Sequence, residues 1–409
     1  MSTLRLTHTA QQLSGKCVIT GSKSESNRLL ILQALFPELE VLNLSNSDDT
    51  QAMMRGLSSF EEIIDIGHAG TTMRFLTSYF ATTPGVQKTL TGSKRMQQRP
   101  IKILVDALRT IGAEIEYLNN EGYPPLRISG KRITTDSVEL AANVSSQYIT
   151  SLMLIAPKLS KGLTINLVGE ITSIPYINMS CSLLQKVGIK AVFQGQTIQV
   201  FPQENIDSKT VEVESDWSSA SYHFSMVALA ENSQVSIKNY IADSLQGDSV
   251  LVDIYKQLGV SSTFDSNALH LKNNSNVQPH IALNLIKAPD IAQTIAVTCF
   301  GLGISCDLTG LHTLKIKETD RLVALHTELN RLGADIHITD NSLHLSARKN
   351  PIIGGVSIDT YHDHRMAMAF APLGIKTPIC IKDAEVVSKS YPTFWDDLRS
   401  LGFSIDVAK

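Results

Sequence analysis

The stretch GSKSESNR, residues 21–28, stands at the front of an apolar run that ends before Pro37. Ser22 and Glu25 are three residues apart, the spacing of a capping box, in which each residue satisfies a free backbone N–H of the other. This spacing predicts a helix that begins near Lys23 and continues through the apolar residues. The rest of the chain repeats the arrangement of a polar helix start followed by an apolar helix.

Ser24 and Arg28 lie four residues apart, so a helix places them one turn apart on the same face, close to Lys23. The first turn of a helix has free backbone N–H groups and the positive end of the helix dipole. With its hydroxyls and two cations, this helix start suits a phosphate or a carboxylate ligand. The alternative is a capped surface helix with solvated charges. Helix starts with polar or charged residues recur along the chain, which favours the interpretation as a ligand site.

The composition describes a globular protein that is large enough for two domains. The chain has 409 residues, of which 43% are hydrophobic and 18% are charged. One ordinary core does not extend over this length. The formal net charge is −3 and aromatic residues make up 6%, which argues against a nucleic-acid partner. Any affinity for anions therefore has to come from local clusters of cations.

The five cysteines are scattered, without a CxxC pair. Neither a disulfide framework nor a zinc or other metal site is therefore expected. The sequence shows no signal-peptide pattern and no long uninterrupted apolar segment, so we expect no membrane partner. Scattered thiols fit a reducing compartment, and we expect a cytoplasmic monomer.

One phrase recurs five times along the chain. A helical stretch closes on an apolar residue and glycine, and alternating apolar residues follow. The glycine fits a left-handed helix C-cap, and the alternation fits a strand. The five copies are LRTIGAEIEY (108–117), LQKVGIKAVF (184–193), YKQLGVSSTF (255–264), LNRLGADIHI (329–338) and LRSLGFSIDV (398–407).

Two helix starts precede each phrase. The first starts lie near Thr71, Ser145, Ser218, Asp290 and Asp363, and the second near Arg99, Pro175, Gln246, Glu318 and Tyr391. The starts of a pair are 28 to 30 residues apart, and successive first starts are 72 to 74 residues apart. A shortened copy, with starts near Ser22 and Asp49, stands in front. The sequence therefore predicts six repeats, the first of them truncated.

Two sets of three repeats form the natural grouping, because a repeat of roughly 70 residues is too small to be a secure domain alone. We expect an α/β protein of two lobes. Residues 22–213 form the first lobe, and residues 1–21 plus 214–409 form the second. The chain crosses between lobes near residues 20–22 and 214–216. Two crossings make a paired hinge, and a hinge implies a cleft.

Cations recur at the helix starts, where they oppose the helix dipole unless an anion lies beside them. Converging on one cleft, they suit one or two small, multiply charged anions. Ordinary N-caps and salt bridges are the structural alternatives. The seven cations are Lys23, Arg28, Arg99, Lys317, Arg321, Arg365 and Lys389.

Two carboxylates, Asp290 and Glu318, stand among these cations. A carboxylate in a site for anions repels the ligand, so its presence needs a chemical reason. Proton transfer is the usual reason. Anionic ligands nearby would raise the pKa of both groups and lysines would lower it, so the sequence leaves the balance open.

At these residues the chain resembles the 5-enolpyruvylshikimate-3-phosphate synthase family (EPSP synthase, 3-phosphoshikimate 1-carboxyvinyltransferase). The matching segments span nearly the whole chain in the order of the family, and jointly they are highly specific. They are GSKSESNR (21–28), AGTTMR (69–74), QRP (98–100), SSQY (145–148), PY (175–176), SSASY (218–222), PD (289–290), KETDR (317–321), DHRMAM (363–368) and KSYP (389–392). Thr72 departs from the family, which commonly has alanine there.

The resemblance implies a two-lobed inside-out α/β barrel with three repeats per lobe and an active site in the interdomain cleft. It implies transfer of the enolpyruvyl group of phosphoenolpyruvate to the 5-hydroxyl of shikimate 3-phosphate. Phosphate is released, and neither a metal nor an organic cofactor takes part. This step belongs to the shikimate pathway, which leads to chorismate and the aromatic amino acids.

By position in the motifs, the resemblance also implies the site residues. Asp290, Glu318 and Lys23 would be catalytic. Shikimate 3-phosphate would be held by Lys23, Ser24, Arg28, Ser145, Ser146, Gln147, Ser173, Asp290 and Lys317. Phosphoenolpyruvate would be held by Lys23, Gly70, Arg99, Gln147, Arg321, Arg365 and Lys389.

Two other functions compete with this interpretation. The UDP-N-acetylglucosamine enolpyruvyl transferase of cell-wall synthesis shares the fold, but usually carries a reactive cysteine in the loop before the Arg99 region. Residues 84–98 contain no cysteine. A non-catalytic anion-binding protein of the same fold would give no reason for Asp290 and Glu318 to stand among cations.

Overall fold

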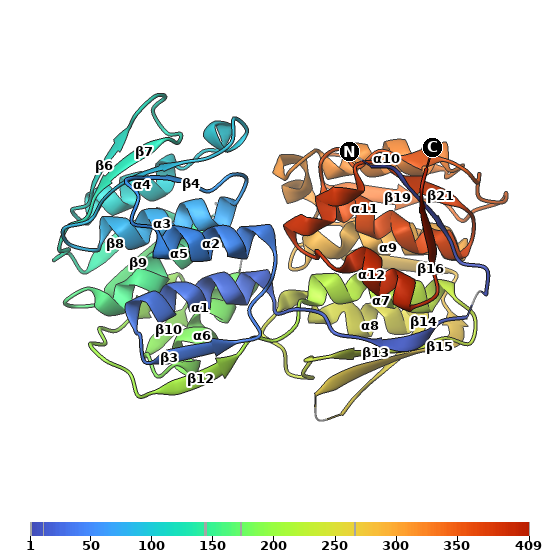
Figure 1. Ribbon diagram of the computed structural model, residues 1–409, viewed down its shortest axis with the longest axis horizontal. Helices are drawn as coiled ribbons and strands as arrows, with labels where there is room; N and C mark the ends of the chain where they lie inside the picture. Colours follow the sequence, from blue (N-terminus) through green and yellow to red (C-terminus); the bar gives the residue numbers. More distant parts are fainter. Residues whose placement is uncertain (1, 11, 143–144, 172–173, 266, 409) are drawn as a thin grey trace. The chain divides into compact units, whose positions relative to one another are not determined.

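The computed structural model describes residues 2–10, 12–142, 145–171, 174–265 and 267–408. The chain forms two compact units (Figure 1). The N-terminal unit consists of residues 21–213, and the C-terminal unit combines residues 1–20 with residues 214–409. Each unit is built from three repeats, and each is described here by itself.

A complete repeat runs strand, helix, strand, helix and two further strands. Its strands form one four-stranded sheet with one parallel pair followed by two antiparallel pairs. The first, second, fourth and third strands of the repeat lie in this order across the sheet. The five sheets of this kind are β4-β5-β7-β6, β8-β9-β11-β10, β2-β13-β15-β14, β16-β17-β19-β18 and β20-β21-β1-β22.

The N-terminal unit contains one truncated and two complete repeats. The truncated repeat has α1 (Lys23–Leu35), β3 (Leu39–Leu42), α2 (Asp48–Ser58) and β12 (Lys209–Glu212). The next has β4 (Ile63–Asp65), α3 (Gly70–Ala81), β5 (Gln87–Thr91), α4 (Lys102–Thr110), β6 (Glu114–Tyr117) and β7 (Leu126–Ser129). The last has β8 (Ser137–Ala141), α5 (Ser146–Ile155), β9 (Leu163–Val168), α6 (Ile174–Lys186), β10 (Ala191–Gln194) and β11 (Thr197–Val200).

The C-terminal unit contains three complete repeats. The first has β2 (Ser14–Cys17), α7 (Trp217–Leu229), β13 (Gln234–Lys238), α8 (Leu251–Gln257), β14 (Leu258–Phe264) and β15 (Ala268–Val277). The second has β16 (His280–Asn284), α9 (Ala292–Leu302), β17 (Ser305–Thr309), α10 (Arg321–Arg331), β18 (Ile336–Ile338) and β19 (Ser342–Leu345). The third has β20 (Ser357–Ile358), α11 (His364–Phe370), β21 (Ile379–Ile381), α12 (Phe394–Ser400), β22 (Ser404–Val407) and β1 (Leu4–Thr7).

Two strands, β12 and β1, complete a sheet from the far end of their unit's sequence, and β2 completes one from the N-terminal segment. β12 pairs in parallel with β3, although about 170 residues separate them. β1 lies between β21 and β22 and is antiparallel to both. β2 supplies the parallel partner of β13. Each unit therefore closes on itself through a strand contributed by its other chain end.

The helix starts agree with the prediction from the repeats. The first helices begin within two residues of the predicted positions, and the second helices begin within five. The glycine of each recurring phrase has a positive φ, as a left-handed C-cap requires: Gly112, Gly188, Gly259, Gly333 and Gly402. The capping box at Ser22 is a wrong prediction, because Ser22 precedes α1 but its side chain makes no capping hydrogen bond.

The first helix of each repeat is buried in the middle of its unit. Ten of the twelve residues of α3 are buried, as are all residues of α9 except the last. α7 packs on α9, and α9 packs on α11, as Figure 1 shows. Hydroxyl pairs connect these helices, among them Ser78 with Ser151 at 2.9 Å and Ser225 with Thr298 at 2.7 Å. A helix that is apolar around its circumference is stable only in such an interior.

The sheets expose one face, since buried residues alternate with exposed ones along β11 and with less buried ones along β9. Each of the five cysteines is a free thiol. No helix in the described part of the chain is both long and apolar enough to cross a membrane. The helix N-termini with their polar side chains are therefore the parts of each unit that offer chemistry beyond packing.

Candidate functional site

A buried arginine binds three carboxylates in the C-terminal unit. The Arg321 side chain, at the start of α10, is 2% exposed. Its Nη1 donates to Asp290 at 2.9 Å, its Nη2 to Glu318 at 2.9 Å, and its Nε to the fully buried Asp363 at 2.7 Å. Burial of a guanidinium is tolerated only when charged partners satisfy its donors. Burial would lower the pKa of Arg321, but Asp363 and the other two carboxylates raise it.

The two predicted catalytic carboxylates, Asp290 and Glu318, are both ionised by their neighbours. Burial would raise the pKa of Asp290, but Arg365, Lys317 and Arg321 hold it well below its usual value. Burial would likewise raise the pKa of Glu318, but Arg321 and Lys389 hold it well below its usual value. Both groups are therefore carboxylates at neutral pH, with no proton to donate.

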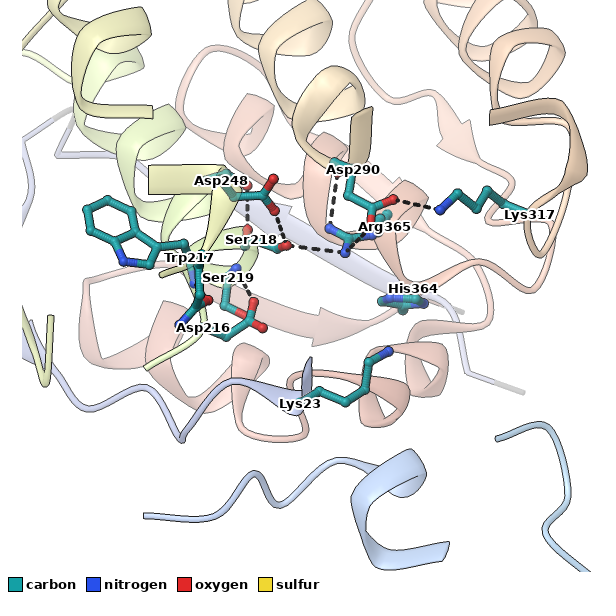
Figure 2. A network of polar contacts seen from close by, with 12 residues as sticks. Lys23, Asp216, Trp217, Ser218, Ser219, Asp248, Asp290, Lys317, His364 and Arg365 are labelled. Atoms are coloured by element: carbon teal, nitrogen blue, oxygen red, sulfur yellow. Dashed lines mark hydrogen bonds and ion pairs between the residues drawn. The ribbon is translucent and has the colours of Figure 1, made fainter. Parts of the chain in front are cut away.

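The other predicted cations of this unit surround the same carboxylates. Figure 2 shows Asp290 with Lys317 on one side and Arg365 on the other. The Lys317 Nζ lies 3.4 Å from Asp290 Oδ1, and Arg365 Nη2 lies 3.3 Å from Asp290 Oδ2. Lys389 Nζ donates to Glu318 Oε1 at 2.6 Å. The structure thus brings together all six predicted site residues of the C-terminal unit.

A second chain of contacts leads away from Arg365. Its Nη2 donates to the Ser218 hydroxyl at 3.3 Å, and Ser218 in turn donates a short hydrogen bond to Asp248 (Figure 2). Arg365 Nη1 also donates to the backbone carbonyl of Asp290 at 3.0 Å. Burial and the charge of Asp290 raise the pKa of Asp248 to about 6. Arg365 is therefore held from two sides before any ligand binds.

The helix-start positions of these cations predicted that they need an external anion. In the structure they already pair with carboxylates of the protein. Arg321 and three further cations pair with three carboxylates. The protein itself supplies the anions that the helix dipole argument required. An anionic ligand would therefore exchange partners with Asp290 and Glu318. Among the described residues, no group of three or more His, Cys, Asp or Glu side chains could hold a metal ion.

The N-terminal unit has its own group of polar helix starts. Lys23, the first residue of α1, lies with its Nζ 3.4 Å from Oδ2 of Asp49, which is buried on α2. The Thr72 hydroxyl on α3 donates to the backbone carbonyl of Asp49 at 3.0 Å. The threonine that departs from the family pattern therefore links α3 to α2. Gln147 on α5 donates to Thr71 on α3 at 3.1 Å.

Gly70 lies directly against the guanidinium of Arg99. A Cβ at Gly70 would be 2.5 Å from Arg99 Nη1 and 2.9 Å from Arg99 Cζ. The neighbouring Pro100 carbonyl accepts hydrogen bonds from Arg74 at 2.7 Å and from the Tyr148 hydroxyl at 2.6 Å. These bonds fix the backbone beside Arg99. The glycine at the start of α3 therefore leaves room for a cation that the next loop delivers.

Arg28 is buried, unlike the other charged residues predicted to bind ligands in this unit. It donates to the Ser180 hydroxyl at 3.0 Å, the Thr150 hydroxyl at 3.3 Å and the Ser24 carbonyl at 2.7 Å. These bonds use three of its five N–H donors. Burial lowers the pKa of Arg28 to about 10, so the side chain is still a cation at neutral pH.

The predicted hydroxyls stand at the N-terminus of α5. Ser145 precedes the helix, and its Oγ accepts a hydrogen bond from the Gln147 backbone N–H at 3.4 Å. Ser146 is the first helical residue. Ser145 is exposed, whereas Ser146 and Gln147 are half-buried. Ser173, the remaining predicted residue, lies outside the described residues.

Sequence reasoning missed several residues that shape these clusters. Asp363 was treated only as a helix start, and Asp49 only as the start of the second helix. Ser218 is predicted only as a helix start and as part of the SSASY segment, and Asp248 is not among the predicted residues. Each carries one weak signal, an acidic or hydroxyl residue at a helix start. Local sequence gives no information on which distant cation such a residue pairs with.

Comparison with known proteins identifies the family. The family model for EPSP synthase (3-phosphoshikimate 1-carboxyvinyltransferase) matches residues 57–398. A 3-phosphoshikimate 1-carboxyvinyltransferase of Bacteroides fragilis is 45% identical over 97% of this chain and 98% of its own length. One from Haemophilus influenzae is 33% identical over 95% of this chain and 96% of its own length.

Solved structures agree on the fold. The EPSP synthase structure from Acinetobacter baumannii aligns over 100% of both chains with a TM-score of 0.82, at 20% sequence identity. A second structure of EPSP synthase from the same organism aligns with a TM-score of 0.80. The matched family model and the full-length relatives show that the chain belongs to the EPSP synthase (3-phosphoshikimate 1-carboxyvinyltransferase) family.

Proposed function

We propose that the chain transfers the enolpyruvyl group of phosphoenolpyruvate to the 5-hydroxyl of shikimate 3-phosphate and releases phosphate. The observation that supports this most is the pair of carboxylates, Asp290 and Glu318, bound to the same buried Arg321. The reaction needs one group that accepts a proton from the hydroxyl and another that delivers a proton to carbon. Two carboxylates can carry out these two proton transfers. Both are held by cations that an anionic substrate can also bind.

The proposed reaction is an addition followed by an elimination. The 5-hydroxyl loses its proton with help from Asp290 and Lys23, and its oxygen attacks C2 of phosphoenolpyruvate. C3 of phosphoenolpyruvate takes a proton from the side of Glu318, which gives a tetrahedral adduct. Loss of phosphate and of a proton from that methyl group restores the double bond. No metal or organic cofactor takes part in this proposal.

Substrate binding would raise the pKa of Glu318, so that this carboxylate takes up a proton from solvent. Arg321 and Lys389 hold its pKa well below the usual value, and both are proposed to bind phosphoenolpyruvate. When the charges of the substrate engage these cations, their hold on Glu318 weakens and its pKa rises. The same exchange would occur at Asp290, because Lys317 and Arg365 are also proposed to bind substrate. Catalytic competence would therefore follow ligand binding.

The assignment of residues to the two substrates is part of the proposal. Shikimate 3-phosphate would bind Lys23, Ser24, Arg28, Ser145, Ser146, Gln147, Ser173, Asp290 and Lys317. Phosphoenolpyruvate would bind Lys23, Gly70, Arg99, Gln147, Arg321, Arg365 and Lys389. The contacts of Gly70 with Arg99, of Gln147 with the α3 start, and of Arg365 with Asp290 support this assignment within each unit.

We further propose that each unit is an inside-out α/β barrel. The first helices of the repeats occupy the interior, and the sheets expose one face. Closure of the sheets by β12 and β1 supports this arrangement, because each of these strands comes from the opposite end of its unit.

A phosphate-release assay with each substrate omitted in turn tests the proposed function. We expect release only when phosphoenolpyruvate and shikimate 3-phosphate are both present. UDP-N-acetylglucosamine in place of shikimate 3-phosphate should give no release. Release with the sugar nucleotide, or none with shikimate 3-phosphate, would contradict the proposal and favour one of the two competing functions.

Substitution of the two carboxylates should separate their roles. Glu318→Gln retains the size of the side chain but removes the proton, so turnover should fall by about 10²–10⁴-fold while substrate binding changes little. Asp290→Asn should lower turnover and also raise the KM for shikimate 3-phosphate, because Asp290 would accept a hydrogen bond from its hydroxyl. Steady-state kinetics and thermal unfolding of both variants provide the test. Near-native turnover in both folded variants would refute the acid–base assignment.

Gly70→Ala should move Arg99 without unfolding the protein. The added methyl group collides with the end of a flexible side chain, so the guanidinium shifts and the melting temperature hardly changes. We expect the KM for phosphoenolpyruvate to rise about 10-fold, equivalent to roughly 1.4 kcal/mol, and the KM for shikimate 3-phosphate to stay nearly constant.

Gly15→Ala is a matched control for this substitution. Its Cβ would also meet the end of a flexible side chain, at 2.7 Å from Leu401 Cδ2, but Gly15 lies outside the proposed site. We expect both KM values to be unchanged in this variant. If Gly70→Ala raises both KM values equally, Gly70 serves the local backbone and not the phosphoenolpyruvate site.

A further inference from the structure

The segment that delivers Asp363 and Arg365 begins with an unfavourable turn. The Asp363 N–H donates to the Thr360 carbonyl at 2.9 Å, which closes a four-residue turn. Both central residues have a positive φ, 54° for Tyr361 and 56° for His362. Turns with two such residues are normally built from glycine and asparagine. Two bulky residues in this conformation store strain, which persists only where surrounding contacts impose it.

The residues that follow the turn belong to the Arg321 cluster. Asp363 accepts the Nε bond of Arg321 and also caps α11, since its Oδ1 accepts from the Arg365 backbone N–H at 2.8 Å. The Arg365 side chain then reaches Asp290 and Ser218. If the turn relaxed, Asp363 would leave Arg321, and Arg365 would lose the capped backbone from which its side chain extends.

A buried carboxylate holds the turn at its tip. The Tyr361 hydroxyl donates to Glu328 Oε1 at 2.8 Å, and Glu328 is fully buried on α10. The other oxygen of Glu328 accepts from Arg331 Nη1 at 2.6 Å. Burial and the neighbouring Glu328 raise the pKa of Tyr361 to about 12. The hydroxyl therefore remains a donor throughout the neutral range.

The residue before the turn is tied to the same helix. Arg331 Nη1 also lies 3.3 Å from Asp359 Oδ2, and Lys382 donates to Asp359 Oδ1 at 2.8 Å. α10 therefore contacts this segment at both helix ends. Arg321 in its first turn binds Asp363, and Glu328 with Arg331 in its last turns binds Tyr361 and Asp359. One rigid helix spans the distance between the two attachments.

We propose that Tyr361 and Glu328 are positioning residues whose hydrogen bond keeps the strained turn, and with it Asp363 and Arg365, in the arrangement that binds an anionic substrate group. This inference rests on the proposed function for the identity of that substrate, phosphoenolpyruvate. Loss of the hydrogen bond would populate a relaxed turn that binds the substrate poorly. A substrate that selects the competent fraction then shows a raised KM with kcat largely retained.

Tyr361→Phe tests this proposal, because it removes only the hydroxyl. We expect the KM for phosphoenolpyruvate to rise about 3- to 10-fold, the effect of one lost hydrogen bond, with kcat and the KM for shikimate 3-phosphate nearly unchanged. Amide hydrogen exchange in the peptide that covers residues 360–368 should accelerate by a similar factor. Tyr255→Phe is the matched control, since the buried Tyr255 hydroxyl pairs with Thr298 at 2.9 Å away from the cluster.

A second substitution separates strain from general destabilisation. The His362 side chain is 75% exposed, and glycine adopts a positive φ without cost. His362→Gly in the Tyr361→Phe background should therefore return the KM for phosphoenolpyruvate toward the native value. A general loss of stability would not be repaired by this change.

Two results would overturn the inference. In one, Tyr361→Phe behaves like Tyr255→Phe, with a lower melting temperature but no change in KM or in exchange at residues 360–368. In the other, His362→Gly fails to restore the KM of the Tyr361→Phe variant. A native enzyme that releases no phosphate would instead contradict the proposed function. The inference about the turn would still be tested in that case, because hydrogen exchange at residues 360–368 measures the restraint by Tyr361 without any substrate.

Discussion

The burial of one guanidinium among three carboxylates is the constraint on which the C-terminal cluster depends. Arg321 is fully enclosed and donates to Asp290, Glu318 and Asp363, which come from three separate segments. Loss of one partner would leave a buried charge uncompensated, at a cost of about 3–5 kcal/mol. The three segments are therefore held in register by electrostatics as well as by packing. This preorganisation places both proposed proton-transfer groups at a fixed separation from the same cation.

The same constraint explains how a site with internal ion pairs can still accept anions. Lys389 and Lys317 each pair with a carboxylate that also contacts Arg321. In the proposed mechanism these lysines would gain a stronger partner when a phosphate or carboxylate group of the substrate arrives. In the proposed mechanism the substrate shares Arg321 with the carboxylates and draws the lysines away from them, so the proton affinity of both carboxylates rises. In the proposed mechanism, substrate binding and the activation of Asp290 and Glu318 are therefore one event. Free lysines would bind anions more tightly but would not couple binding to proton transfer.

Local signals in the sequence predicted the helices and the repeat pattern, because caps, glycines and apolar periods act over a few residues. The five phrase glycines and the helix starts follow from that chemistry. Ion pairs and strand pairs between residues far apart in the sequence leave no such local signal. The bonds of Arg321 to Asp363 and of Lys23 to Asp49, and the insertion of β1 between β21 and β22, depend on the closed fold. For this reason the sequence gives no carboxylate partner for Lys23 or Arg365, although the folded protein supplies Asp49 to the first and Asp290 to the second.

Titration of the Asp290 and Glu318 carboxyl carbons by ¹³C NMR, with assignments from the Asp290→Asn and Glu318→Gln variants, tests the electrostatic account most directly. Both groups should titrate well below their usual values of 3.8 and 4.5 in the ligand-free protein. In Arg321→Lys, which keeps the charge but loses the three-way geometry, both pKa values should move back toward those values. Titration of either native carboxylate at or above its usual pKa would contradict the account.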